Sequence, residues 1–109
     1  MDAAAVIVLT TLPVSADADG FARTLVEERL AACVGVYGEM RSVYRWNEAV
    51  ESEPERQLVI KTSRSRLAAL ESRAASLHPY QIPEWLVLDP SGGSAAYLAW
   101  LANATMSGR

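Results

Sequence analysis

Residues 33–62 read CVGVYGEMRSVYRWNEAVESEPERQLVIKT, and this stretch decides the fold. After Gly38 the side chains alternate with a period of two, which is typical of a β-strand. Met40, Ser42, Tyr44 and Trp46 face one way, and Arg41, Val43 and Arg45 face the other. Residues 47–49 favour a turn into a returning strand over residues 50–62. The sequence therefore predicts a long β-hairpin, with a bulge or bend at Gly38.

The two halves of the returning strand have different compositions. Its first half, Glu51–Glu55, is polar and contains Pro54, which is typical of an exposed sheet edge. Its second half, Leu58–Ile60, is apolar and suits a core. At ~3.3 Å per residue, arms of about a dozen residues reach roughly 40 Å, longer than so small a domain is wide. We therefore expect the overhanging part of the hairpin to pair with other copies of the chain.

The remaining segments complete a recognisable order of elements. We expect a central strand over residues 6–11, covered on both faces, and a last strand over residues 85–88. The expected helices cover residues 15–32 (capped by Ser15 or Asp17), 63–77 (ended by Pro79) and 95–102 (capped by Ser94), before a frayed tail over residues 102–109. This order predicts an α+β fold. It is a ferredoxin-like βαββαβ sandwich with an extended hairpin and a short C-terminal helix, in one domain spanning residues 1–109.

Composition narrows the function classes. Half of the 109 residues are hydrophobic and the net charge is −3, so the chain is globular and offers no basic surface to nucleic acid or an anionic membrane. Its apolar run Ala3–Leu9 is too short to span a bilayer and no basic leader precedes it, so we expect a cytoplasmic protein. The single cysteine, Cys33, excludes an internal disulfide and a CxxC zinc site.

Several runs of residues together resemble one family. They are Thr10–Pro13 (TTLP), Leu25–Val34 (LVEERLAACV), Tyr44–Trp46 (YRW), Ile60–Thr62 (IKT), His78–Glu84 (HPYQIPE) and Tyr97–Leu101 (YLAWL). In this order they resemble the CutA divalent-cation tolerance family. The resemblance implies a ferredoxin-like protomer in a tight homotrimer joined by extended strands. It also implies a role in tolerance to divalent metal ions, including copper. The family's trimer is similar to that of the PII signalling proteins, whose clefts between subunits bind small effectors.

Candidate site residues concentrate near a proline-flanked turn. We expect a ligand-binding cleft lined by Trp46, Lys61, His78, Tyr80 and Glu84, and metal ligands for Cu²⁺ or another divalent cation at Cys33, His78 and Glu84.

Each of these residues also has a structural interpretation. Cys33 suits either a soft copper site or a small core position. His78 suits either backbone hydrogen bonding at its turn or a cleft, and Lys61 either reaches the rim or pairs with Glu84. Tyr44 and Trp46 suit either a pocket wall or a trimer contact, whereas the acidic run from Glu48 to Glu55 is interpreted as a solvated guard on the hairpin.

These observations favour a non-enzymatic trimer that binds metal or a small ligand between its subunits. A structural or adaptor trimer, or a PII-like signalling protein with an indirect metal phenotype, remains the alternative. Gly92-Gly93 lacks the flanking residues of a nucleotide-binding loop. An enzyme would need a Cys33–His78 dyad for thiol chemistry, which the resemblance does not imply.

Overall fold

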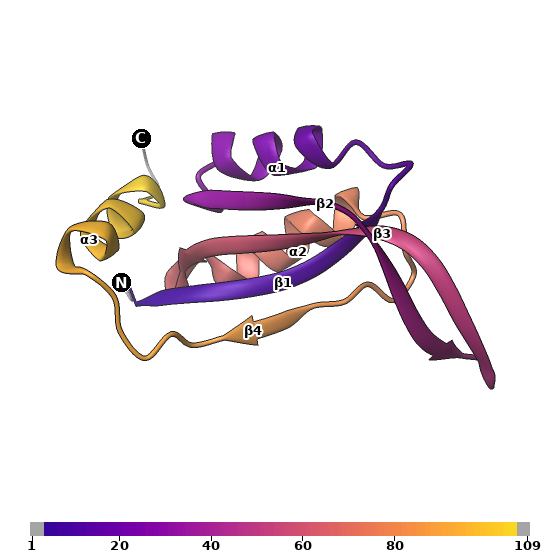
Figure 1. Cartoon of the computed structure of the whole chain (residues 1–109). Coiled ribbons are helices and arrows are strands. Elements are labelled where there is room, and N and C mark those ends of the chain that lie inside the picture. The colour runs from indigo at the N-terminus through magenta and orange to yellow at the C-terminus, as the bar shows by residue number, and fades with distance from the viewer. Residues whose placement is uncertain (1–3, 107–109) are drawn as a thin grey trace.

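A computed structural model describes residues 4–106 (Figure 1). In chain order the elements are β1 (Ala5–Pro13), α1 (Ala18–Glu27), β2 (Cys33–Trp46), β3 (Ala49–Ser63), the 3₁₀ turn η1 (Arg64–Arg66), α2 (Leu67–Leu77), β4 (Leu86–Leu88) and α3 (Ala95–Ala104). The predicted βαββαβ order and the added C-terminal helix are confirmed. Within residues 4–106, the helices lack the length and apolarity needed to cross a membrane.

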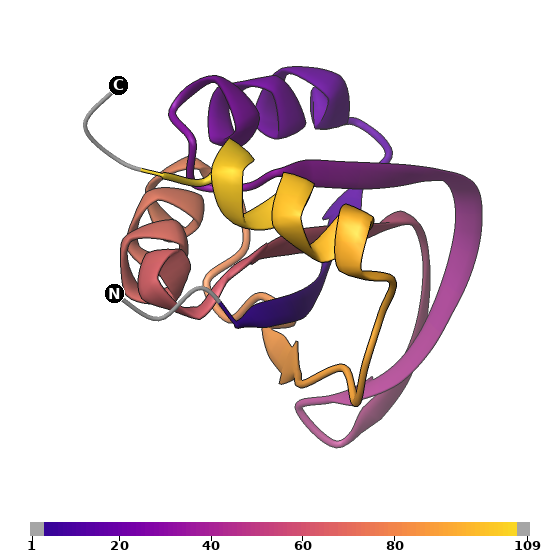
Figure 2. The same ribbon diagram turned by 90° about the vertical axis from the view of Figure 1, so that its left-hand side faces the viewer.

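The four strands form one antiparallel sheet in the order β2-β3-β1-β4. The first strand is central, as its apolar run predicts, and pairs with β3 on one side and β4 on the other. Helices α1 and α2 pack against one face of this sheet (Figures 1 and 2). The strand predicted over residues 85–88 is shorter, since only Leu86–Leu88 join the sheet.

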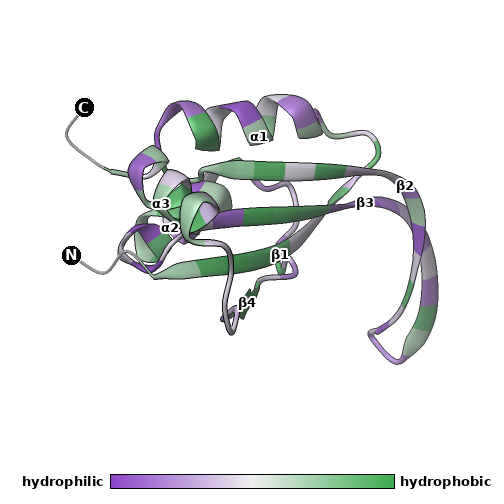
Figure 3. Cartoon of the chain, turned by 60° about the vertical axis from the view of Figure 1, so that its left-hand side comes forward, coloured by the Kyte–Doolittle hydropathy of each residue, from purple (hydrophilic) through white to green (hydrophobic). Residues whose placement is uncertain are grey.

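The core lies between the sheet and these two helices. Alternate residues of β1 and β3 point into it, including Val8, Leu58 and Ile60, each fully buried against Leu25 and Leu70 of the helices. Figure 3 shows hydrophobic residues running along β1 in the middle of the sheet.

The opposite sheet face is less well covered than the sequence predicts. Leu86 and Leu88 are 56% and 46% exposed, and Ile7 and Leu9 beside them are half-buried. The prediction that the first strand is covered on both faces is therefore wrong for one chain alone.

The first helix is shorter than predicted at both ends. The Asp17 side chain accepts a hydrogen bond from the Gly20 amide, which confirms Asp17 rather than Ser15 as the cap. Arg29 adopts a positive φ of 59°, which ends the helix in a left-handed turn. Ala31 and Ala32 then leave the helix and become buried on the way into β2.

The expected frayed tail is wrong for residues 102–105. Ser94 caps α3 by accepting from the Tyr97 amide, and the helix continues to Ala104. Thr105 is 1% exposed, and its hydroxyl hydrogen-bonds that of Ser63 and the Leu101 carbonyl. These buried contacts hold the chain against the end of β3. Residues 107–109 of the predicted tail lie outside the described residues.

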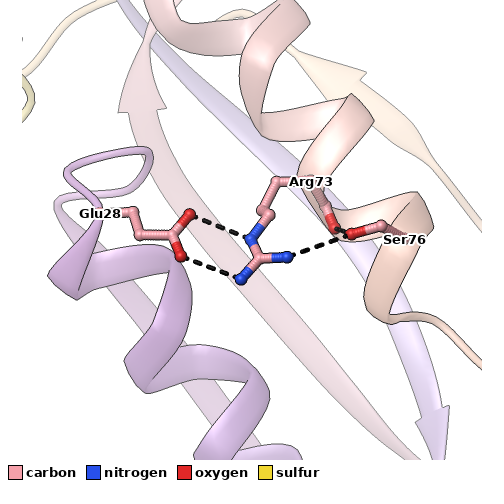
Figure 4. A network of polar contacts seen from close by, with 3 residues as sticks. All are labelled: Glu28, Arg73 and Ser76. Carbon is pink, nitrogen blue, oxygen red and sulfur yellow. Dashed lines mark hydrogen bonds and ion pairs between the residues drawn. The ribbon is translucent and has the colours of Figure 1, made fainter.

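An exposed ion pair joins the two packed helices. Arg73 of α2 donates to both carboxylate oxygens of Glu28, with both nitrogen–oxygen distances at 3.0 Å (Figure 4). Arg73 also contacts the Ser76 hydroxyl, which in turn donates to the Arg73 carbonyl. This bidentate pair links the end of α1 to α2 at the surface of the molecule.

The long hairpin is confirmed. Asn47 and Glu48 have φ values of 48° and 63°, which make a tight two-residue turn between the paired residues Trp46 and Ala49. The register shifts between Val36 and Glu39, which confirms the irregularity predicted at Gly38.

We call residues 39–54 the arm, because this part of the hairpin extends past the sheet (Figures 1 and 2). The first strand pairs with β3 only from Glu55 to Ser63. Among the described residues, residues 49–54 therefore pair with β2 alone, and their other edge is open. The arm contributes to the 44 Å length of a chain that is 27 by 23 Å across.

Candidate functional site

The segment between α2 and β4 lies against the base of the arm, and His78 holds it there. Pro79 ends the helix and places His78 in an extended conformation, as predicted. The Nδ1 atom of His78 accepts from the Tyr80 amide at 3.1 Å, so Nε2 carries the proton and donates to the Thr11 carbonyl at 2.7 Å. The ring also packs edge-on against Phe21, with centroids 6.2 Å apart. Both imidazole nitrogens are therefore occupied within the chain.

Tyr80 connects this segment to β3. Its hydroxyl donates to Oε2 of Glu55 at 2.6 Å, and Glu55 is only 7% exposed. Burial raises the pKa of Tyr80 well above its ordinary value, and the hydrogen bond to Glu55 raises that pKa further. The phenol therefore stays neutral and keeps donating to the carboxylate at neutral pH.

The side chain of Glu84 is held by Gln57 of β3. The Gln57 side-chain amide donates to Oε2 of Glu84 at 3.0 Å and to the Thr10 carbonyl at 2.8 Å. Gln57 is the register partner of Thr11, whose carbonyl receives His78. Both ends of the segment are thus tied to the same end of β1.

Two cavities adjoin these residues. One, of about 370 Å³, is lined by Glu55 and Glu84 together with Thr11, Ser42, Val43 and Tyr44. The other, of about 240 Å³, is lined by Tyr44, Trp46, Tyr80, Gln81 and Ile82. Tyr44 lines both, so we describe them together as the arm cleft, with a carboxylate end and an aromatic end.

Three of the five residues predicted for the ligand cleft line the arm cleft, whereas His78 lies next to it and lines a separate cavity. Trp46 and Tyr80 share the aromatic end, Glu84 lines the carboxylate end, and the His78 ring lies 5.1 Å from that of Tyr80.

Lys61 lies elsewhere, and its expected pairing with Glu84 is wrong within the chain. Its ammonium nitrogen is 5.8 Å from the centre of the Tyr97 ring. Glu84 instead accepts from Gln57, four residues before Lys61 on β3 and ~13 Å away along the strand.

The predicted metal ligands do not converge within one chain. Cys33 is the register partner of Lys61, so it lies four residues along β3 from Gln57, which holds Glu84. Among residues 4–106, no three histidine, cysteine, aspartate or glutamate side chains group closely enough to hold a metal ion. A metal site assembled from several copies of the chain stays a prediction.

Sequence reasoning missed the buried carboxylate of the cleft and the glutamine that positions Glu84. Glu55 was interpreted as part of a solvated guard, yet it is buried and lines the cleft. Gln57 was not considered, although it positions Glu84. Period-two alternation places Glu55 on the same strand face as Glu51 and Glu53, so it carries no signal that Glu55 alone is buried.

Comparisons with known proteins agree with this fold. The sequence profile of the CutA1 divalent ion tolerance protein family matches residues 6–104. The divalent-cation tolerance protein CutA of Pectobacterium atrosepticum is 44% identical over 102 residues, covering 94% of this chain and 92% of its own length.

Solved structures give the same result. The divalent cation tolerance protein CutA1 of Thermus thermophilus superposes with a TM-score of 0.89 at 39% identity, covering 94% of this chain and 99% of that one. CutA of Synechococcus elongatus also reaches 0.89 at 38% identity, covering 97% and 95% of the two chains. The sequence match spans nearly every element described above, and the chain therefore belongs to the CutA1 divalent ion tolerance protein family.

Proposed function

We propose that the protein is a non-enzymatic homotrimer that acts in divalent-cation tolerance and binds a divalent metal ion, including Cu²⁺, or a small ligand in clefts between its subunits. Family membership supports the link to divalent cations. The open edge of the arm and the half-exposed sheet face support assembly, because both leave backbone or apolar groups to be covered. A cytoplasmic location stays a prediction.

The observation that carries the proposal is the position of the arm cleft. Ser42, Val43 and Tyr44 line its carboxylate end, and all three belong to the arm, whose two outer edges are unpaired among the described residues of a single chain. A copy that pairs with the arm therefore lies beside the cleft. Ligand binding and assembly are then properties of the same part of the molecule.

The donor set indicates which metal chemistry fits. Glu55 and Glu84 supply carboxylate oxygens and Thr11 and Ser42 supply hydroxyls, ligands that suit hard or intermediate divalent ions better than Cu(I). His78 joins such a site only by giving up its bond to Tyr80 or Thr11. The metal half of the proposal therefore depends mainly on Glu84 and Glu55.

Titration calorimetry with Cu²⁺ and with Zn²⁺ tests the metal half. We compare wild type with Glu84→Gln and His78→Ala, and use Glu27→Gln on the exposed surface of α1 as a control that removes one carboxylate elsewhere. The proposal expects Glu84→Gln to weaken binding about tenfold or more and Glu27→Gln to leave it unchanged. Weak isotherms that are the same in all four proteins would contradict direct metal binding.

An adaptor trimer is the second candidate, favoured by the exposed apolar side chains of the arm. Val43 and Val50 are 68% and 66% exposed and lie on one face of the hairpin. Affinity capture from a lysate at matched ionic strength, with wild type and the double variant Val43→Lys/Val50→Lys, tests this candidate. A protein retained in stoichiometric amount by wild type alone supports it. Equal retention by both proteins contradicts it.

A further inference from the structure

The two faces of the arm carry opposite charges. The register pairs Tyr44 with Glu51, Ser42 with Glu53 and Met40 with Glu55, which places the three carboxylates on the face that also carries Trp46. The other face carries Arg41 and Arg45, and at the base of the arm Arg56 lies opposite Glu39 on this face. Figure 3 shows hydrophilic and hydrophobic residues interleaved along this part of the hairpin. One face of the arm is thus aromatic and acidic, and the arginines of the hairpin lie on the opposite face.

In a single chain the aromatic end of the arm cleft is open to solvent. Tyr44 and Trp46 are 41% and 45% exposed, and with Tyr80 they give three aromatic walls to a cavity of about 240 Å³. This volume lies just below the range of drug-sized pockets, so it suits one small group.

Glu55 places a negative charge beside these rings. It is 7% exposed, and none of the ion pairs among residues 4–106 includes it. A buried carboxylate without a cation is costly, so the site favours the arrival of a positive charge. Burial raises the pKa of Tyr44, and Glu53, Glu51 and Glu55 raise that pKa further, so all three carboxylates act on the aromatic end.

We propose that the arm cleft binds a small organic cation of the quaternary or alkylated ammonium class. Such a cation is held by the faces of Tyr44, Trp46 and Tyr80 and is neutralised by Glu55. The inference rests on the proposed function in one respect, namely that the arm cleft is the ligand-binding site. It names the class of small ligand that this site takes.

Ring faces select this class over a metal ion. They attract a weakly hydrated alkylammonium group, whereas a metal ion needs lone pairs that the aromatic end supplies only through Gln81 and the tyrosine hydroxyls. The Tyr80 hydroxyl is engaged by Glu55, which fixes the orientation of that ring. The same hydrogen bond brings the carboxylate next to the aromatic walls.

A pair of probes with one shape and different charge tests the proposal. Choline chloride carries the trimethylammonium group, and 3,3-dimethyl-1-butanol replaces it with an uncharged tert-butyl group. Calorimetry and tryptophan fluorescence on the full chain are expected to show choline binding about tenfold or more tightly than the alcohol. Equal binding of the two probes, or binding of neither, would overturn the proposal.

Matched variants locate the binding. Trp46→Leu and Glu55→Gln are each expected to weaken choline binding about fivefold to tenfold. Glutamine keeps an oxygen that accepts from Tyr80, so Glu55→Gln removes the charge with little change in shape. Trp100→Leu is the control, since Trp100 is 47% exposed, like Trp46, but lies in α3 with its ring 5.4 Å from that of Tyr97. Choline binding that survives Trp46→Leu and Glu55→Gln would overturn the assignment to the arm cleft.

Sedimentation velocity on the same samples separates this inference from the proposed trimer. A monomer that binds choline through Trp46 and Glu55 supports the organic-cation site and contradicts the trimer. A trimer that ignores choline but dissociates in Glu55→Gln overturns the organic-cation site, because a basic side chain of a second copy then supplies the charge.

Discussion

Strands β2 and β3 run through both the arm and the rest of the described chain, which we call the body, yet only the body has a core that is completed within one chain. Leu58 and Ile60 of β3 are fully buried beneath α1 and α2. A few residues away on the hairpin, Val43 and Val50 are more than 60% exposed. The body has the interior of an ordinary small domain. The arm has exposed apolar side chains and unpaired strand edges, so under the proposed assembly the chain folds and associates through different residues.

The largest effect is expected in the body. Leu58→Ala removes a fully buried side chain from the centre of the sheet and lowers the free energy of unfolding by about 3 kcal/mol. Urea titration monitored by circular dichroism measures this loss. A loss below about 1 kcal/mol would show that the interior between sheet and helices is not the main source of stability.

Substitutions in the arm are expected to weaken self-association and to leave the folding stability of the chain largely unchanged. Val43→Lys/Val50→Lys places two charges on exposed positions and weakens self-association about tenfold or more, because apolar contacts between copies become charged. Sedimentation equilibrium measures the association, with Val26→Lys on α1 as the control, since Val26 is 40% exposed on the body. Equal association of the double variant and wild type would mean that this face of the arm meets no other copy.

A substitution at the junction between body and arm is expected to have an intermediate effect on the free energy of unfolding, and this effect depends on pH. Tyr80→Phe removes the donor to Glu55 and lowers the free energy of unfolding by about 1–2 kcal/mol at neutral pH. Because the folded-state pKa of Tyr80 is raised, its contribution is complete below the unfolded value of about 10 and is lost as pH rises toward the folded value.

Denaturant titrations at several pH values check this sign. The stability difference between wild type and Tyr80→Phe is expected to be constant from pH ~6 to ~9 and to shrink above pH ~10. A difference that grows above pH ~10 would contradict the neutral, donating phenol.

The smallest effect is expected at the surface of the body. Arg73→Ala breaks the bidentate pair with Glu28 and lowers the free energy of unfolding by only about 0.5 kcal/mol, because both side chains are about 40% exposed and solvent screens them. A double-mutant cycle with Glu28→Ala at low and high salt measures the coupling. Coupling above about 2 kcal/mol that is insensitive to salt would place this pair among the main supports of the body.

The fold was predictable because its signals are local. Alternation after Gly38, the Asp17 and Ser94 caps and the stop at Pro79 each act within a few residues, and the structure confirms all of them. Element ends were less predictable. The first helix ends early because Arg29 takes a left-handed conformation, and α3 extends further because Thr105 is buried against Ser63, which is distant in sequence.

The candidate site was predictable only in part, because its geometry depends on strand register. The period-two alternation of the hairpin shows that Trp46 and Tyr44 share a face, but it does not show that Tyr80 lies beside them. Lys61 and Glu84 are compatible as an ion pair by charge, yet the register places Gln57 rather than Lys61 next to Glu84. Glu55 looks like a surface residue in a polar run, and only its hydrogen bond to Tyr80 and its burial reveal its position in the cleft.

The central claim is that other copies of the chain complete the arm. Sedimentation velocity of wild type at micromolar concentration tests it most directly, because one chain has a mass of 11.8 kDa. The account predicts one species of three times that mass, which shifts toward the single-chain mass in Val43→Lys/Val50→Lys. A wild-type protein that sediments as a single chain across the accessible concentration range would contradict it.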